Sequence, residues 1–205
     1  TPNPGHGAPY GTDPGFPTMG NGGYTVTGYD LDIDYRVGSE RLEGTVVITA
    51  TATQKLSRLT LDLSGLIASK VAVNGSRAAK FSQTDGKLVI RPSRPLAAEQ
   101  SFTVMVQYGG FPHTHSEYPA TGWISSADAV TVVASPVGSS SWFPCNDQPG
   151  EAVPVRLRIS CDSSHRVTAP GNALSPSQRG NRTIWVFDTR DSLPLANLIV
   201  EISRN

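Results

Sequence analysis

The sequence predicts an all-β fold, in which short antiparallel strands and hairpins form a sandwich with almost no helix. Apolar and polar residues alternate along several stretches, as they do in strands that are buried on one face. Asn74-Gly75 and Asp85-Gly86 separate short apolar stretches, and such dipeptides favour two-residue hairpin turns because both residues must take positive φ. No window of eleven or more residues repeats its apolar positions with the 3.6-residue period of a helix.

The size and charge of the chain narrow its class. Its 205 residues are enough to bury a core, and we expect one domain. The 17 basic and 17 acidic residues cancel, so no overall field would attract nucleic acid or an anionic membrane. No apolar run approaches the ~20 residues that a membrane-spanning helix needs. We therefore expect neither a nucleic-acid partner nor a membrane span.

Residues 1–23 differ in composition from the rest of the chain. Proline and glycine recur through them, at Pro2, Pro4, Gly5, Gly7, Pro9, Gly11, Pro14, Gly15, Pro17, Gly20, Gly22 and Gly23. Such a composition does not repay the entropy of ordering by forming regular structure, so a leader arm is predicted, followed by a single β domain over residues 24–205. The arm is interpreted as a spacer from a membrane anchor or cell wall, with partial order toward its end, where Tyr10, Phe16 and Met19 could contact the domain.

The first two strands follow from alternation between residues 24 and 52. The first has an apolar face of Tyr29, Leu31, Ile33, Tyr35 and Val37 and a polar face of Asp30, Asp32, Asp34 and Arg36. The three aspartates suggest a cation site, but alternation alone explains them as the solvated face of a strand. After a turn at residues 38–40, the second strand places inward Leu42, Gly44, Val46, Ile48, Ala50 and Ala52.

Further short strands are predicted at residues 59–63, 71–73, near 81, 88–90, 102–108, 129–134, 153–161, near 167, 184–186 and 195–202. Residues 109–128 are predicted to be a loop because glycine and proline recur in them. Within it, His113 and His115 could bind a transition metal from one face of a strand, but no third ligand is obvious. They are interpreted as ordinary loop histidines, and no metal site is predicted.

Cys145 and Cys161 are interpreted as buried thiols, with a disulfide between them as the alternative. If their segments form a hairpin about residues 146–152, Cys161 lies ~8 residues beyond the position that faces Cys145, or roughly 26 Å at ~3.3 Å per residue. Cys161 is also in phase with Leu157 and Ile159, which favours an inert position in the core.

The most unusual stretch is an aromatic pair that runs into a turn bracketed by two prolines. We call residues 142–150 the corner; its distinctive residues are Trp142, Phe143, Pro144, Cys145, Asp147 and Pro149. The prolines fix φ at both ends, and the Asp147 carboxylate can accept hydrogen bonds from nearby backbone N–H groups. The corner is therefore predicted to be rigid, and its residues to be structural.

The sequence motifs of self-contained enzymes are absent from this stretch of 205 residues. It contains no H-E-x-x-H, no G-x-S-x-G, no Walker loop and no Cys-x-x-Cys pair. Ser139, Ser140 and Ser141 offer hydroxyls but have no partnered base. We predict no catalytic residue and no metal ligand in this chain, and no activity from the chain alone.

Several stretches carry a family resemblance in their order and spacing. They are Asn21-Gly22-Gly23-Tyr24, Gly28-Tyr29-Asp30-Leu31-Asp32-Ile33, Leu42-Glu43-Gly44, residues 59–63 and the corner. Over residues 20–203 the chain resembles the N-terminal domain of the aminopeptidase N family of zinc metallopeptidases, and the end of the arm is similar to the secreted actinobacterial branch. Pro-Cys-x-Asp-x-Pro is the most specific element, although the family more often has Trp and Glu where this chain has Asn146 and Gln148.

The resemblance implies a saddle-like β domain that packs against the protein's own catalytic domain, which holds the zinc and the general base. Residues 195–202 are similar to the last strand of that domain, so we expect the chain to be part of a longer enzyme. The implied protein is a secreted or cell-surface zinc aminopeptidase that removes N-terminal residues from peptide substrates. A stand-alone β-sandwich module for binding or adhesion, without enzymatic activity, is the alternative.

The resemblance also indicates one substrate-binding position. The family uses a Gln or Glu nine residues before the Pro-Cys pair to bind the substrate α-amino group, and counting back from Pro144 reaches Ser135. A serine can accept a hydrogen bond but brings no charge, so a charge-assisted contact to an ammonium group would be lost or shifted to a neighbour. The alternative is that Ser135 simply ends a strand before Pro136.

Overall fold

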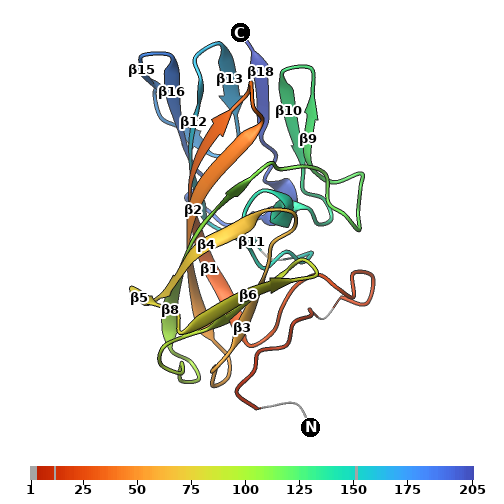
Figure 1. Cartoon of the computed structure of the whole chain (residues 1–205), viewed down its shortest axis with the longest axis vertical. Helices are drawn as coiled ribbons and strands as arrows, with labels where there is room; N and C mark the ends of the chain where they lie inside the picture. The colour runs from red at the N-terminus through yellow and green to blue at the C-terminus, as the bar shows by residue number, and fades with distance from the viewer. Residues whose placement is uncertain (1–3, 12, 151) are drawn as a thin grey trace.

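The computed structural model describes residues 4–11, 13–150 and 152–205, and in them the fold is all-β, as predicted. The helical elements of this part are two short 3-10 turns, η1 (Ser139–Ser141) and η2 (Leu195–Asn197). None of its helices is long and apolar enough to cross a membrane. The molecule is elongated, with its described N-terminal and C-terminal ends at opposite extremes (Figure 1).

A large nine-stranded sheet forms the backbone of the molecule. In spatial order it contains β14 (Asn172–Ala173), β16 (Arg182–Asp188), β12 (Val155–Asp162), β1 (Tyr24–Arg36), β2 (Arg41–Ala52), β8 (Ser101–Gly110), β4 (Ile67–Val73) and β5 (Ser76–Arg77), with β15 (Ser177–Arg179) paired to β16. Its pairings are antiparallel except that β1 and β12 run parallel. Alternation predicted both strands but not this direction, because it does not encode which strand lies beside which.

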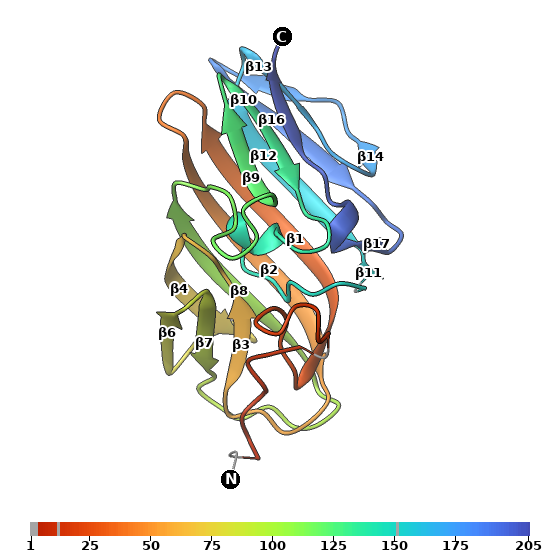
Figure 2. The same cartoon turned by 90° about the vertical axis from the view of Figure 1, so that its right-hand side faces the viewer.

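Smaller sheets cover one face of the large sheet (Figure 2). A four-stranded sheet lies toward the C-terminal end and contains β13 (His165–Thr168), β18 (Glu201–Arg204), β10 (Ala129–Val133) and β9 (Gly122–Ser126). A three-stranded sheet lies toward the N-terminal end and contains β3 (Leu59–Asp62), β7 (Lys87–Arg91) and β6 (Lys80–Thr84). A short pair joins β11 (Ala152–Val153) to β17 (Leu193–Pro194).

The predicted faces of the strands are confirmed. β1 buries Tyr29, Leu31, Ile33 and Tyr35, whereas Asp30 and Asp32 are exposed. The two predicted hairpin turns have positive φ at both central residues, 50° and 78° at Asn74-Gly75 and 51° and 77° at Asp85-Gly86. Cys145 and Cys161 are both thiols buried in the core.

Two local expectations were wrong, and the hairpin considered for Cys145 is not formed. β9 lies within the predicted loop at residues 109–128, and its pairing with β10 accounts for a strand that its two serines and a glycine did not indicate. The predicted strand at 195–202 begins only at Glu201, because Leu195–Asn197 form a turn. The segment of Cys145 does not pair with β12 as a hairpin; Cys145 instead forms a β-bridge with Asp62.

Candidate functional site

An aromatic row connects the corner to the core of the large sheet. Trp142 and Phe143 are completely buried, and their ring centroids lie 4.6 Å apart. Phe143 contacts Tyr29 of β1 edge-on at 5.6 Å, and Trp142 contacts Trp123 of β9 at 5.9 Å. The corner is therefore held between the large and the four-stranded sheets by its two aromatic side chains.

Asp147 fixes the loop that precedes the corner. Its carboxylate accepts hydrogen bonds from the backbone N–H of Gly138, at 3.1 Å, and of Ser140, at 3.0 Å, and from Ser140 Oγ at 2.7 Å. Burial raises the pKa of Asp147, and the bonds from Ser140 and Gly138 act against that rise. Gly138 has a φ of 144°, and a Cβ there would lie 2.7 Å from the Val133 carbonyl oxygen. The backbone thus turns tightly around the carboxylate.

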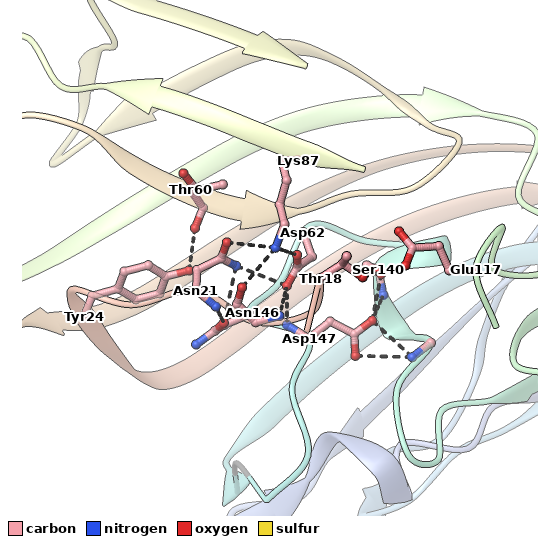
Figure 3. A network of polar contacts seen from close by, with 12 residues as sticks. Thr18, Asn21, Tyr24, Thr60, Asp62, Lys87, Glu117, Ser140, Asn146 and Asp147 are labelled. Carbon is pink, nitrogen blue, oxygen red and sulfur yellow. Dashed lines mark hydrogen bonds and ion pairs between the residues drawn. The ribbon is translucent and has the colours of Figure 1, made fainter. Parts of the chain in front are cut away.

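A second buried carboxylate, Asp62 at the end of β3, holds the other side of the corner (Figure 3). Its oxygens accept hydrogen bonds from the Asp147 backbone N–H, at 2.9 Å, and from Lys87 Nζ, at 2.5 Å. Asp62 and Cys145 also exchange backbone hydrogen bonds of 2.7 and 3.0 Å. Burial raises the pKa of Asp62 to about 6, although the ammonium of Lys87 opposes the rise.

The arm is the third part of this network. Met19, Gly20 and Asn21 are buried, and Phe16 stacks on Tyr118 with ring centroids 5.3 Å apart, whereas Tyr10 is 59% exposed. Residues 1–3 and 12 of the predicted arm lie outside the described residues. The rest of the arm forms no helix or named strand, as predicted, but it contacts the domain at many points, from Pro4 O, which accepts a hydrogen bond from Gln54, and a bridge between His6 and Arg58 onward.

Ser135 lies two residues after β10 and is exposed, as is Pro136. From Val137 to Asp147 every residue is buried. Ser139, Ser140 and Ser141 are therefore inside the protein, where Ser140 binds Asp147 and Ser141 Oγ accepts a hydrogen bond from the Trp123 backbone N–H. We call residues 135–141 the presenting loop. Its tip, Ser135 and Pro136, lies at the surface, and its base, residues 137–141, is buried.

The two loop histidines do different things. His115 is buried, its Nδ1 accepts a hydrogen bond from the Glu117 backbone N–H, and burial lowers its pKa. His113 is exposed and contacts the Phe111 carbonyl oxygen. Among the described residues, no three His, Cys, Asp or Glu side chains are grouped so that they could hold a metal ion. This part of the chain therefore does not fit a zinc ion.

A large hollow lies on the opposite, open face of the large sheet. It has a volume of about 1120 Å³ and is lined by β1, β2 and β8 and by the residues that follow β8. Ile67 and Phe111 are 72% and 57% exposed on its rim, and the guanidinium of Arg41 lies 5.8 Å from the centre of the Phe111 ring. Neither Ser135 nor any corner residue lines it, whereas Asp32, Asp34 and His113, which were considered above as metal ligands, do.

Sequence reasoning missed Asn21, Asp62 and Lys87. Alternation within β3 places Asp62 opposite Leu61, on a face that is normally solvated, and Lys87 follows a hairpin turn, where lysines are usually exposed. The only signal was indirect: an aspartate flanked by Leu61 and Leu63 in a strand that is short and apolar.

Residues 26–194 match the protein family described as Peptidase M1 N-terminal domain. The fold is similar to that of an M1 zinc metallopeptidase from Deinococcus radiodurans, with 28% identity and a TM-score of 0.84. Two mutant M1 zinc metallopeptidases, one from the same organism bound to a Tyr-Ser-Ala substrate and one described as a two-domain protein bound to L-tryptophan, match with 28% and 29% identity and the same TM-score. Each match covers 92% of this chain but 44% of the other chain, so this chain spans less than half the length of these relatives. No curated protein sequence matches the chain. The match over residues 26–194 shows that the chain belongs to the family of peptidase M1 N-terminal domains.

Proposed function

We propose that this chain is the substrate-side domain of a zinc aminopeptidase, that it carries no catalytic residue itself, and that it docks against a catalytic domain of the same protein. The observation that carries the proposal is the presenting loop: Ser135 and Pro136 are exposed, while the residues from Val137 to Asp147 are buried. A loop fixed from below and exposed at its tip suits the placing of one contact beside a cleft.

In this proposal Ser135 contacts the α-amino group of the peptide. Its hydroxyl oxygen can accept one hydrogen bond from the ammonium, without the charge assistance of a carboxylate. The corner residues Trp142, Phe143, Pro144, Cys145, Asp147 and Pro149 then act as scaffold, since all but the half-buried Pro149 lie inside the protein. The similar solved structure is described as an M1 zinc metallopeptidase, and in this proposal the zinc ion would be bound by the rest of the protein.

The test is to give Ser135 a charge in the whole peptidase. Ser135→Glu should lower KM for aminoacyl-amide substrates about tenfold with kcat little changed, because the contact would be made in the ground and transition states alike. The binding of N-acetylated analogues, which lack the ammonium group, should not change. Ser126→Glu, at an exposed serine of β9, is the matched control and should leave KM unchanged. An equal change in both variants would contradict the proposed contact.

A direct test uses the chain itself. Incubated with zinc and aminoacyl amides, the 205-residue chain should show no turnover. Robust hydrolysis by the isolated chain would overturn the assignment of the chemistry to another domain.

The proposal places the protein outside the cytoplasm, on the cell surface or secreted. Support comes from the resemblance of the end of the arm, Gly20 to Tyr24, to secreted members of the family. Antibodies against this domain should label intact producing cells or their culture medium. Detection in the cytosol alone would contradict this location.

The hollow on the open face favours a second candidate, a module for binding or adhesion. The mass of the native protein separates the two functions. A native protein near the 21.7 kDa of this chain supports the module, and one several-fold larger supports the peptidase.

A further inference from the structure

The second half of the arm is bonded to the corner by buried polar groups. The Gly20 N–H and Asn21 Nδ2 donate to Asp62 Oδ2 at 3.0 and 3.1 Å. The Asn21 N–H donates to Asn146 Oδ1 at 2.7 Å. Asn21 and Asn146 are 3% and 0% exposed, so these hydrogen bonds are made away from water. A simple spacer would need none of them, because an arm that only spans a distance keeps its polar groups hydrated.

The arm is also fitted sterically to the corner. A Cβ on Gly20 would lie 2.4 Å from Gln148 Oε1 and 2.8 Å from Gln148 Cβ, and a Cβ on Gly11 would lie 2.5 Å from the same Oε1. Gly20 also has a φ of +83°, a conformation that other residues rarely adopt. At Gly20, where Gln148 Cβ is also close, the side chain of Gln148 therefore occupies a space that only glycine leaves open; at Gly11 a Cβ would also lie 2.9 Å from the Met19 carbonyl oxygen.

One oxygen atom of β3 is bonded to both the arm and the corner. Asp62 Oδ2 accepts hydrogen bonds from Gly20 and Asn21 of the arm and from the backbone N–H of Asp147. The side chain of Asp147 in turn binds Gly138 and Ser140. A continuous path of buried hydrogen bonds thus runs from the arm, through Asp62 and Asp147, to the presenting loop (Figure 3).

We propose that Gly20 and Asn21 are positioning residues, and that the docked arm sets the conformation of the presenting loop through Asp62 and Asp147. The arm is therefore an integral part of the domain and not only a spacer. That this affects substrate binding rests on the proposed function; that the arm and the loop are coupled does not.

The coupling is tested on the 205-residue chain by amide hydrogen exchange. Asn21→Ala removes the side-chain hydrogen bonds that Asn21 donates to Asp62 and Asn146 and the one that it accepts from Lys87 Nζ. The Gly138 and Ser140 amides, which bind Asp147, should then exchange about tenfold faster, while the amides between β1 and β2 keep their rates. Gln54→Ala is the matched control, because Gln54 Nε2 holds the arm only at its other end, through the carbonyl oxygens of Pro4 and His6. It should leave Gly138 and Ser140 unchanged.

Two results would overturn the inference. One is unchanged exchange at Gly138 and Ser140 in Asn21→Ala; the other is equal acceleration throughout the sheet, which would mean that Asn21 only contributes to global stability. If Asn21→Ala does not fold, Gln148→Ala loosens the packing of the arm on the corner at Gly20 and should accelerate the same two amides; no local change there also overturns the inference.

Kinetics of the whole peptidase separate this inference from the proposed function. With both correct, Asn21→Ala raises KM several-fold with little change in kcat, and Gln54→Ala changes neither. Faster exchange with unchanged KM would uphold the coupling and sink the assignment of the presenting loop to substrate binding.

Discussion

The large sheet and the corner are stabilised in opposite ways. In the sheet, β1 and β2 bury apolar side chains at alternate positions, so that Leu31, Ile33, Val46 and Ile48 are at most 1% exposed. In the corner, Trp142 and Phe143 are buried in the same way, but most of its other contacts are made by buried polar atoms, above all the carboxylates of Asp147 and of its neighbour Asp62. Stability in the sheet is spread over many similar contacts, whereas the polar contacts of the corner are concentrated in two carboxylates.

This difference has an energetic reason. Burial of an apolar side chain stabilises the fold by ~1.5–3 kcal/mol, and a slightly smaller side chain keeps most of that gain. A buried carboxylate costs several kcal/mol in lost hydration and is tolerated only when its oxygens are bonded. Asp62 has the cation Lys87 beside it, while Asp147 relies on backbone N–H groups and a hydroxyl. A single change should therefore break the corner but only weaken the sheet.

The largest effect is expected for Asp147→Ala. It leaves the N–H groups of Gly138 and Ser140 buried without an acceptor and should lower the free energy of unfolding by ~3–5 kcal/mol. Ile33→Val in the sheet should cost only ~1 kcal/mol. Urea denaturation measures both as shifts of the midpoint at constant m. Equal losses in the two variants would remove the distinction between the regions.

The next effect concerns the ion pair of Asp62 and Lys87, whose side chains are 1% and 14% exposed. Lys87→Met leaves the Asp62 carboxylate buried without its cation and should cost ~3 kcal/mol. Asp62→Asn should lower the free energy of unfolding less in the Lys87→Met background than in the unmodified chain. A double-mutant cycle should give a coupling energy of ~1–2 kcal/mol. Strict additivity would show that the two groups do not depend on each other.

The same contrast explains what the sequence could predict. Period-two alternation indicated the buried faces of β1 and β2, because each face is marked by four or more residues. It correctly marked Asp30 and Asp32 as exposed, but applied to residues 59–63 the same rule would place Asp62 in solvent, whereas Asp62 is 1% exposed. What covers Asp62 is the arm and the corner, which lie 41 and 85 residues away in the chain. Alternation within a strand carries no information about such a covering segment.

The corner was predicted to be rigid from Pro144, Asp147 and Pro149, and the bonds of Asp147 agree with that prediction. Its partners were not predictable, because a buried carboxylate can be satisfied by any donor that the fold brings to it. Asn146 and Gln148 are the two positions where the corner departs from the residues more usual in the family. Asn146 accepts the Asn21 N–H and Gln148 fills the space beside Gly20, so both departures contact the arm.

A smaller effect should appear in the pH dependence of stability. Burial raises the pKa of Asp62 from 3.8 to about 6, so between these values the folded state binds more protons than the unfolded state. This group alone therefore makes stability fall as the pH rises through that window, by up to ~1.4 kcal/mol per pH unit. Asp147 has a raised pKa and acts in the same direction, whereas the lowered pKa of His115 opposes both, since its contribution is lost as the pH falls below 6.5.

Asp62→Asn removes the first of these contributions. The free energy of unfolding of this variant, measured in urea at pH 4, 5 and 6, should fall less steeply with rising pH than that of the unmodified chain. Ile33→Val introduces no titrating group, so its curve should run parallel to that of the unmodified chain. If the slopes of Asp62→Asn and the unmodified chain are the same, Asp62 does not change its protonation in this window.

The smallest effect is expected where the sheet carries an ion pair of its own. Arg41 and Glu43 lie 3.1 Å apart on the open face, with side chains 48% and 62% exposed. Water and salt screen such a pair, and holding two long side chains costs entropy, so Arg41→Ala should lower the free energy of unfolding by no more than ~0.5 kcal/mol. The contact of Arg41 with Phe111 is also open to solvent and adds little.

The pair of Arg41 and Glu43 and the pair of Lys87 and Asp62 each join one cation to one carboxylate within hydrogen-bonding distance, so burial is the main variable between the two pairs. The effect of burial is therefore measured by the urea midpoints of Arg41→Ala and Lys87→Met at low and high salt. A loss of free energy of unfolding of similar size in both variants would show that burial is not what makes the corner sensitive to substitution.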